Sequence, residues 1–172
     1  MIVGNKEWKK LFLFSLGLFA GTAFCMKWME DGFWQNGEKF TIIGLEVSYS
    51  KEKVTAILSG LDEHVKKILR YHLLFDFAFM AGVYPGIAAL CMIAREKITR
   101  GVLRKILFIL ALLQTVAWGS DIAENSYLLK WIKNPVIGNE FEAYHFIVAL
   151  KWCIALTGTL LAIPLAIRRR RR

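Results

Sequence analysis

The sequence predicts an all-α membrane protein, a transmembrane four-helix bundle with an extracytoplasmic loop and helix cap between spans one and two. Of the 172 residues, 56% are hydrophobic and the mean hydropathy is +0.41, which is too apolar for an ordinary soluble domain. The charged residues, 22% of the chain, gather between long apolar runs. Only three prolines interrupt the sequence. We therefore treat residues 1–172 as one four-span membrane domain.

Four apolar runs are long enough to cross a bilayer, whose core of about 30 Å needs about 20 helical residues. The spans are expected at about 11–28, 71–93, 103–125 and 144–167. Lys6, Lys9 and Lys10 before the first run are also typical of a signal peptide. However, this run is longer than a usual signal core, and Phe24 before Cys25 does not suit a lipoprotein-type cleavage site. We expect the first span to be retained.

The outer loop at residues 29–70 is too long to be without structure. Residues 40–47 are rich in apolar and β-branched side chains and predict a short extended segment. From Ser50, a suitable N-cap, apolar residues recur at i, i+3, i+4 and i+7, which predicts a helix ended by Gly60. A second helix is expected to start near Asp62 and to continue into span two.

The distribution of charge predicts the orientation. Residues 94–105 carry five basic residues and one acidic residue, and residues 27–70 carry seven of each. Under the positive-inside rule, the N- and C-termini are cytoplasmic and the membrane is expected to be a bacterial inner membrane. Two basic clusters are interpreted as topology signals and, second, as contacts for anionic lipid: the Arg168–Arg172 tail and the set Arg95, Lys97, Arg100, Arg104 and Lys105. The net charge of +9 does not form the basic, aromatic-interleaved face of a nucleic-acid binder.

Smaller features concern packing. Glycines at Gly17 and Gly21 predict a close helix contact in span one, and Gly82 and Gly158 predict further contacts in spans two and four.

The three cysteines are widely separated and form no C-x-x-C pair. Thiol-disulfide exchange and a zinc ribbon are therefore excluded.

Ionisable residues inside spans are costly unless they are paired or functional. Asp76 lies about 7 to 8 Å into span two, and Lys151 about 10 Å into span four, at 1.5 Å per residue. The outer end of span three brings further polar residues to the same depth. We expect one polar pocket near the outer boundary, made by eight residues: His72, Asp76, Tyr84, Gln114, Asp121, Glu124, Asn125 and Lys151.

Three interpretations of this pocket stay open. In the structural one, Lys151 is the counter-ion of Asp76 or Asp121, although the acids outnumber this single lysine. In a catalytic one, a divalent metal such as Zn²⁺ or Mn²⁺ activates water against a lipid; its ligands are His72, Asp76, Asp121, Glu124 and His145. In the third, Asp76, Glu124 and Lys151 form an ion or proton pathway, which would need a homo-oligomer.

Two motifs carry a resemblance. The segment Phe75-Asp76-Phe77-Ala78-Phe79 with Tyr84 is followed by Trp118-Gly119-Ser120-Asp121-Ile122-Ala123-Glu124-Asn125. Together they resemble a pattern in small four-span bacterial integral membrane proteins that have no assigned activity. The resemblance covers about residues 45–129. It implies that Asp76, Asp121, Glu124 and Asn125 act together, and it supplies no reaction.

The leading functional expectation is a binding or accessory protein. At the pocket it would recognise a small ligand, a lipid headgroup or a helix of a partner membrane protein. A metal-dependent lipid hydrolase comes second, and an oligomeric ion or proton pathway third. The expected partners are membrane lipids, a second copy of the chain or another membrane protein, with no nucleic acid.

Overall fold

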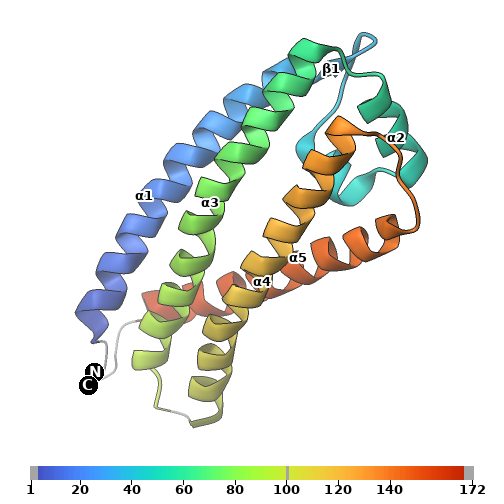
Figure 1. Ribbon diagram of the computed structural model, residues 1–172. Coiled ribbons are helices and arrows are strands. Elements are labelled where there is room, and N and C mark those ends of the chain that lie inside the picture. The colour runs from blue at the N-terminus through green and yellow to red at the C-terminus, as the bar shows by residue number, and fades with distance from the viewer. Residues whose placement is uncertain (1–3, 100, 169–172) are drawn as a thin grey trace.

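The computed structural model describes residues 4–99 and 101–168, and within these ranges the chain is almost entirely helical. Four helices are long and apolar enough to cross a membrane. They are α1 (Asn5–Met29), α3 (Glu63–Glu96), α4 (Gly101–Lys133) and α5 (Glu140–Ile167) (Figure 1). The four-span prediction is confirmed, with helices longer than the apolar runs. At 1.5 Å per residue, α3 with its 34 residues is about 51 Å long and exceeds a bilayer core.

Short elements connect α1 to α3. They are η1 (Glu30–Gly32), β1 (Trp34–Gln35), β2 (Glu38–Lys39), η2 (Gly44–Ser48) and α2 (Lys51–Ser59). We call the end of the bundle that carries these elements and residues 134–139 the loop end. The opposite end carries the start of α1, the end of α5 and the connection from α3 to α4 (Figure 1), and we call it the terminal end. Of the Arg168–Arg172 tail, only Arg168 lies within the described residues.

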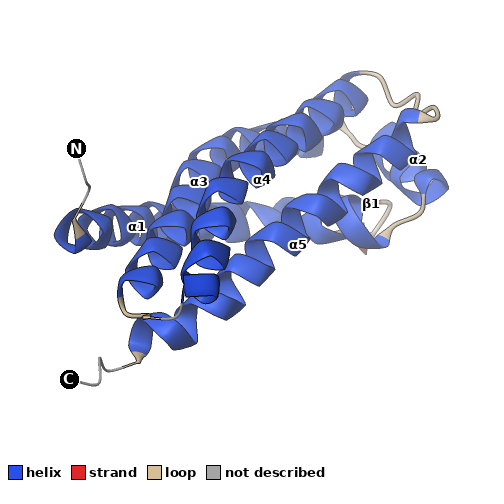
Figure 2. Ribbon diagram, turned by 90° about the horizontal axis from the view of Figure 1, so that it is seen from below, coloured by secondary structure: helices blue, strands red, loops and turns tan. Residues whose placement is uncertain are grey.

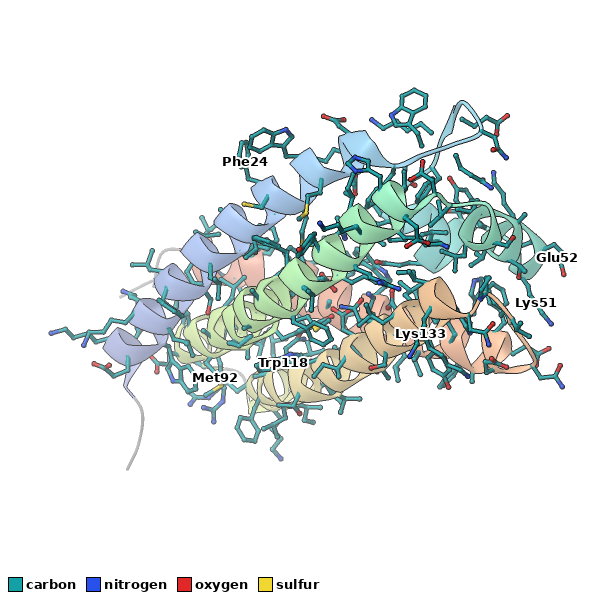
Figure 3. The ribbon with its side chains drawn as sticks, turned by 45° about the horizontal axis from the view of Figure 1, so that its top comes forward. Phe24, Lys51, Glu52, Met92, Trp118 and Lys133 are labelled. Carbon is teal, nitrogen blue, oxygen red and sulfur yellow. The ribbon has the colours of Figure 1, made fainter. Side chains whose placement is uncertain are left out.

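Helix α3 is the centre of the bundle, since it packs against α1, α4 and α5, whereas α1 packs chiefly against α3 (Figure 2). The α1–α3 contact is close at Gly82, where an added Cβ would lie 2.7 Å from the backbone nitrogen of Phe19. Gly17 and Gly21 have open space instead. The close contact predicted there therefore does not form within the described residues of this chain: α1 turns Ser15 and Thr22 inward, and Phe24 points away from the bundle (Figure 3).

Helices α2 and α3 begin at the predicted residues. The Ser50 hydroxyl accepts a hydrogen bond from the Lys53 amide at 3.3 Å at the start of α2. The Asp62 carboxylate accepts one from the Val65 amide at 2.8 Å at the start of α3. These side chains satisfy amides that have no partner inside a helix. Gly60 ends α2, as expected.

Residues 40–47 are not extended, contrary to the prediction. Thr41 caps the segment through its side-chain oxygen, which accepts from the Gly44 amide at 3.0 Å, and the chain then forms the π-helical turn η2. The buried residues here are Phe40, Ile42, Gly44, Leu45 and Glu46. Of these, Ile42, Leu45 and Glu46 form an i, i+3, i+4 set. Helical spacing, rather than alternation, therefore turns this apolar run inward.

The bundle interior is layered. The layer at the loop end is apolar and joins loop residues to helix ends, among them Phe33, Leu45, Leu58, Leu69, Leu128, Trp131 and Tyr144. A second apolar layer contains Met80, Tyr84, Ala117 and Ile154. A third lies near the terminal end and includes Cys91, Leu107 and Ala162. Between the first and second layers lies a layer of polar side chains.

Candidate functional site

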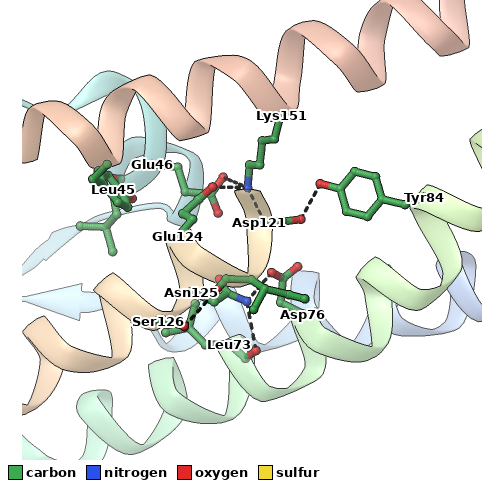
Figure 4. Close-up of polar contacts among 12 residues, drawn as sticks. Leu45, Glu46, Leu73, Asp76, Tyr84, Asp121, Glu124, Asn125, Ser126 and Lys151 are labelled. Carbon is green, nitrogen blue, oxygen red and sulfur yellow. Dashed lines mark hydrogen bonds and ion pairs between the residues drawn. The ribbon is translucent and has the colours of Figure 1, made fainter. Parts of the chain in front are cut away.

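The polar layer contains four buried carboxyl groups around one buried lysine (Figure 4). The acids are Glu46, Asp76, Asp121 and Glu124, and the lysine is Lys151; we call these five residues the carboxylate cluster. Each has a relative exposure of 8% or less. They come from η2, α3, α4 and α5. Three separate spans and one loop element therefore build the site.

Lys151 lies at the centre of the cluster. Its Nζ is 2.6 Å from Asp121 Oδ1, 2.5 Å from Glu124 Oε2 and 3.5 Å from Glu46 Oε2. Lys151 is one turn of α5 beyond Val148 and two turns beyond Tyr144, both buried on the same face. The spacing of apolar residues on α5 thus aims the ammonium group inward. Of the two predicted pairs, Lys151–Asp121 forms, and Asp76 is instead bound to Asn125.

Glu46 was not expected in the site from the sequence. It reaches the cluster because η2 is held against α5: the Tyr144 hydroxyl donates to the Leu45 carbonyl at 3.1 Å, and Lys151 donates to Glu46. Burial raises the pKa of the Glu46 carboxyl; nearby Asp121 raises it further and Lys151 opposes the rise. The available signal was a lone acid in the apolar run Ile42-Ile43-Gly44-Leu45-Glu46-Val47.

Tyr84 lies at the boundary between the polar layer and the second apolar layer. Its hydroxyl donates to Asp121 Oδ2 at 2.6 Å, so both oxygens of Asp121 are occupied, one by Tyr84 and one by Lys151. The Tyr84 ring stacks on Trp118 with centroids 6.4 Å apart. Tyr84 is one of the eight residues predicted at the pocket, and its hydroxyl contacts the carboxylate cluster.

Asp76 and Asn125 form a pair across α3 and α4. The Asn125 amide nitrogen donates to Asp76 Oδ2 at 2.7 Å and lies 3.5 Å from the Leu73 carbonyl. Because a carbonyl oxygen only accepts, this contact fixes which end of the amide is the nitrogen. Asn125 therefore directs its Oδ1 away from both groups.

Several acceptor oxygens in this region have no hydrogen-bond donor within the described residues. They include Glu124 Oε1 and Asn125 Oδ1, both on residues that are fully buried. Glu124 Oε2 lies close to Lys151, but the geometry of that ion pair is not that of a hydrogen bond. Buried polar atoms are usually paired, because an unpaired one costs about 1–3 kcal/mol. Glu124 Oε1 and Asn125 Oδ1 are both acceptors, so this part of the polar layer lacks donors or positive charge.

The charges are also unbalanced. If every group were ionised, four carboxylates would face one ammonium, a net charge of −3 in an interior with apolar layers on both sides. Such a charge is not stable without compensation. The cluster must therefore hold protons or a cation in addition to Lys151.

The cluster lies near one end of the uncharged part of the spans. On its terminal side, residues 77–93, 106–120 and 152–167 contain no Asp, Glu, Lys or Arg. These stretches of 15 to 17 residues correspond to about 22 to 26 Å of helix. They would cover most of a bilayer core of about 30 Å. The cluster therefore lies nearer to the loop end than to the terminal end.

Gln114 lies deeper than the cluster. Its amide nitrogen is 3.2 Å from the Leu110 carbonyl and 3.5 Å from the Ile154 carbonyl, and so joins α4 to α5. Its amide also lies where a side chain at Gly158 would have to be, 2.9 Å from the position of an added Cβ. Gln114 thus belongs to helix packing.

The two histidines predicted at the site lie apart from the carboxylate cluster. His72 faces Phe33, with ring centroids 5.3 Å apart, and its Nε2 is 4.0 Å from Glu30 Oε1. The His145 ring packs against Phe141 in a tilted arrangement, with centroids 4.6 Å apart. The structure therefore brings six of the eight predicted pocket residues into or beside the polar layer, whereas His72 packs against Phe33 and Gln114 contacts backbone carbonyls of α4 and α5.

The metal interpretation predicted His72, Asp76, Asp121, Glu124 and His145 as ligands. Within residues 4–99 and 101–168, no three His, Cys, Asp or Glu side chains are arranged to hold a metal ion. Lys151 Nζ occupies the space between Asp121 and Glu124, where a shared cation would otherwise lie. The two histidines, as described above, have other neighbours.

Comparison of the chain with protein-family models, with curated proteins and with solved structures found no match. The function therefore has to be inferred from the geometry and chemistry of the site.

Proposed function

We propose that this chain is an integral membrane protein of the binding type, and that its carboxylate cluster takes up a small cation. The observation that carries the proposal is the ratio of four buried carboxyl groups to one ammonium group. The unpaired oxygens Glu124 Oε1 and Asn125 Oδ1 also support it, because acceptors without donors are what a cation or proton would satisfy. The simplest such ligand is the proton, which needs no set of coordinating side chains. Na⁺, K⁺ or a small protonated amine would have to bind beside Glu124 Oε1 and Asn125 Oδ1, because Lys151 already lies between Asp121 and Glu124.

The ligand would enter from the loop end. Glu46 comes from η2 rather than from a span, and it is the cluster member that a change in the loop could withdraw. The helical stretches on the other side of the cluster are free of charge and about 22 to 26 Å long. Entry from the loop side therefore avoids most of the hydrocarbon core.

We also infer an orientation from the charge distribution. The five basic residues within residues 94–105 favour a cytoplasmic terminal end and an extracytoplasmic loop end, in a bacterial inner membrane. A cysteine added after residue 172 should then be protected from an impermeant maleimide in intact cells and become labelled after permeabilisation. Labelling in intact cells would reverse the orientation and place the cluster near the cytoplasm.

An ion or proton pathway is a second candidate, favoured by the continuity of the contacts. Glu46, Lys151, Asp121 and Tyr84 are linked in that order by the distances given above. Beyond Tyr84 the interior is an apolar layer. The linked polar side chains therefore extend through only the loop-end part of the bundle. This favours binding over conduction. The metal-dependent hydrolase has the weakest support, because both predicted histidine ligands lie apart from the carboxylate cluster and the described residues contain no group of side chains arranged to hold a metal ion.

The test measures both protonation and cation binding on the purified full-length protein. Infrared difference spectroscopy detects the C=O stretch of protonated carboxyl groups, and thermal unfolding in Na⁺, K⁺ or ethanolammonium chloride at constant ionic strength detects bound cations. We expect a buried carboxylic acid signal that weakens when a cation binds or the pH rises. Glu124→Gln should change this signal and reduce the stabilisation by cation.

Glu142→Gln is the matched control, since Glu142 is exposed and the substitution is the same. It should behave like the wild type. The proposal fails if the wild type shows no protonated carboxyl signal and none of the three cations stabilises it. Proteoliposome flux that requires Glu124 would instead favour the pathway.

A further inference from the structure

A basic groove lies at the terminal end, far from the carboxylate cluster along α3 and α4. It is formed where α3 ends and α4 begins, at the bottom of Figure 1. Its volume is about 390 Å³, and its lining residues are Arg95, Gly101, Arg104, Lys105, Phe108 and Ile109. Three cationic side chains therefore border one groove on the protein surface.

These cations are not neutralised by acids in the described residues. Neither Arg95, Arg104 nor Lys105 forms a salt bridge among residues 4–99 and 101–168. Arg95 Nε is shielded from solvent and has no hydrogen-bond partner in that part of the chain. Like charges held close together repel each other. The groove therefore has an unsatisfied preference for an anion.

Two contacts hold the guanidinium groups in place. The Arg95 guanidinium lies 5.3 Å from the centre of the Phe108 ring, in cation–π geometry. Arg104 donates from Nη1 to the Ile98 carbonyl at 3.3 Å. The two groups are thus partly ordered before any ligand binds, which reduces the entropy lost on binding.

The start of α4 adds to the positive potential. Helix α4 begins at Gly101 without an acidic residue in its first turn, so the positive end of its dipole is not offset locally. An added Cβ at Gly101 would meet nothing within 4 Å. Within the described residues, the space beside the Gly101 α-carbon is therefore open.

The apolar part of the lining indicates which kind of anion would bind. Phe108 and Ile109 are 43% and 53% exposed and belong to the uncharged stretch of α4 at residues 106–120. In a membrane protein these side chains face acyl chains. A ligand in this groove would meet cations at one side and hydrocarbon contacts at the other, as an anionic phospholipid requires.

We propose that this groove binds the phosphate headgroup of an anionic phospholipid, with an acyl chain along Phe108 and Ile109. The site is independent of the carboxylate cluster. Arg95 and Arg104 contact the phosphate, and Lys105, which is exposed, contributes its charge at the rim. The lipid contact suggested by the charge of residues 94–105 as a whole is thus assigned to Arg95, Arg104 and Lys105.

The test compares lipids with identical acyl chains and different headgroups. Full-length protein is reconstituted in nanodiscs or mixed micelles with phosphatidylglycerol or phosphatidylcholine, and retained lipid is counted by native mass spectrometry. We expect a preference for phosphatidylglycerol that falls about fivefold for each cation removed. The variants are Arg104→Gln and Lys105→Gln, and Arg104→Lys should keep most of the preference because it keeps the charge.

Lys133→Gln is the control, since it removes the same charge from an exposed position at the other end of α4. The proposal is overturned if the wild type has no preference, or if Lys133→Gln reduces it as much as Arg104→Gln does. Inorganic phosphate that displaces the lipid at equal concentration would identify a free anion as the ligand and would also overturn it. If Arg104→Gln fails to fold, Lys105→Gln decides the test, because its side chain is exposed.

Discussion

Lys151→Met removes the only ammonium group of the carboxylate cluster and keeps a side chain of similar length. The wild-type lysine is 6% exposed and contacts carboxylates of Asp121, Glu124 and Glu46. Removing one partner of a buried ion pair typically costs about 3–5 kcal/mol, because the remaining charge is left without compensation. For a chain of this size that corresponds to a fall in Tm of about 6 to 20 °C.

The assay is thermal unfolding in one detergent at constant ionic strength, with Lys133→Met as the matched control. Lys133 is exposed, and exposed substitutions usually change stability by less than about 0.5 kcal/mol. Equal Tm values for the two variants would refute the assignment of Lys151 as a structural counter-charge.

The pH dependence gives a second, independent readout. Lys151 lowers the pKa of Glu46, whereas burial raises it; in Lys151→Met the lowering contribution is gone. A carboxyl group with a raised pKa in the folded state favours folding at low pH, and this contribution is lost as the pH rises through the folded pKa. The deficit of Lys151→Met relative to the wild type should therefore shrink on acidification. A deficit that does not change with pH would mean that lost packing, rather than stranded charge, destabilises the variant.

Three further predictions concern packing, hydrogen bonding and capping, all measured by the same unfolding assay. Gly82→Leu should destabilise by about 1–3 kcal/mol, because its Cβ would meet α1 backbone, whereas Gly17→Leu should have little effect; equal effects would contradict the observed α1–α3 contact. Tyr84→Phe should cost about 1–3 kcal/mol, since it leaves an oxygen of Asp121 without a donor, and a neutral result would show that another donor replaces the hydroxyl. Asp62→Ala should cost about 1 kcal/mol through loss of the cap of α3, and an unchanged Tm would show that this cap is not needed.

The spans and loop helices were predictable because their signals are local. A run of apolar residues decides that a helix crosses a membrane, and Ser50 and Asp62 mark helix starts through short-range hydrogen bonds. The hairpin β1–β2 also has a local signal, the Asn36-Gly37 turn with positive φ at both residues. That signal is present in the sequence, although residues 34–39 were not predicted to form a hairpin.

The partners within the site were less predictable, because they depend on how each helix is rotated. The sequence shows that Lys151 needs an acidic partner, but it does not distinguish Asp76 from Asp121. In the structure the rotation of α4 brings Asp121 to Lys151. His72 shares a helix face with Asp76 by spacing, yet its ring packs against Phe33 of the loop. Glu46 was missed because its position depends on a contact between η2 and α5, which are about 100 residues apart. Periodicity within one segment does not contain such information.

The attachment of η2 to α5 has a consequence for how the loop and the buried protons influence each other. Glu46 belongs to a segment that is not a span, so a conformation with η2 undocked would withdraw one carboxyl group from the cluster. Because docking raises the pKa of Glu46, the docked conformation binds more protons than the undocked one. Coupling of this kind is reciprocal. Acidification favours the docked loop, and any partner that captures the undocked loop lowers the proton affinity of a site buried among the spans.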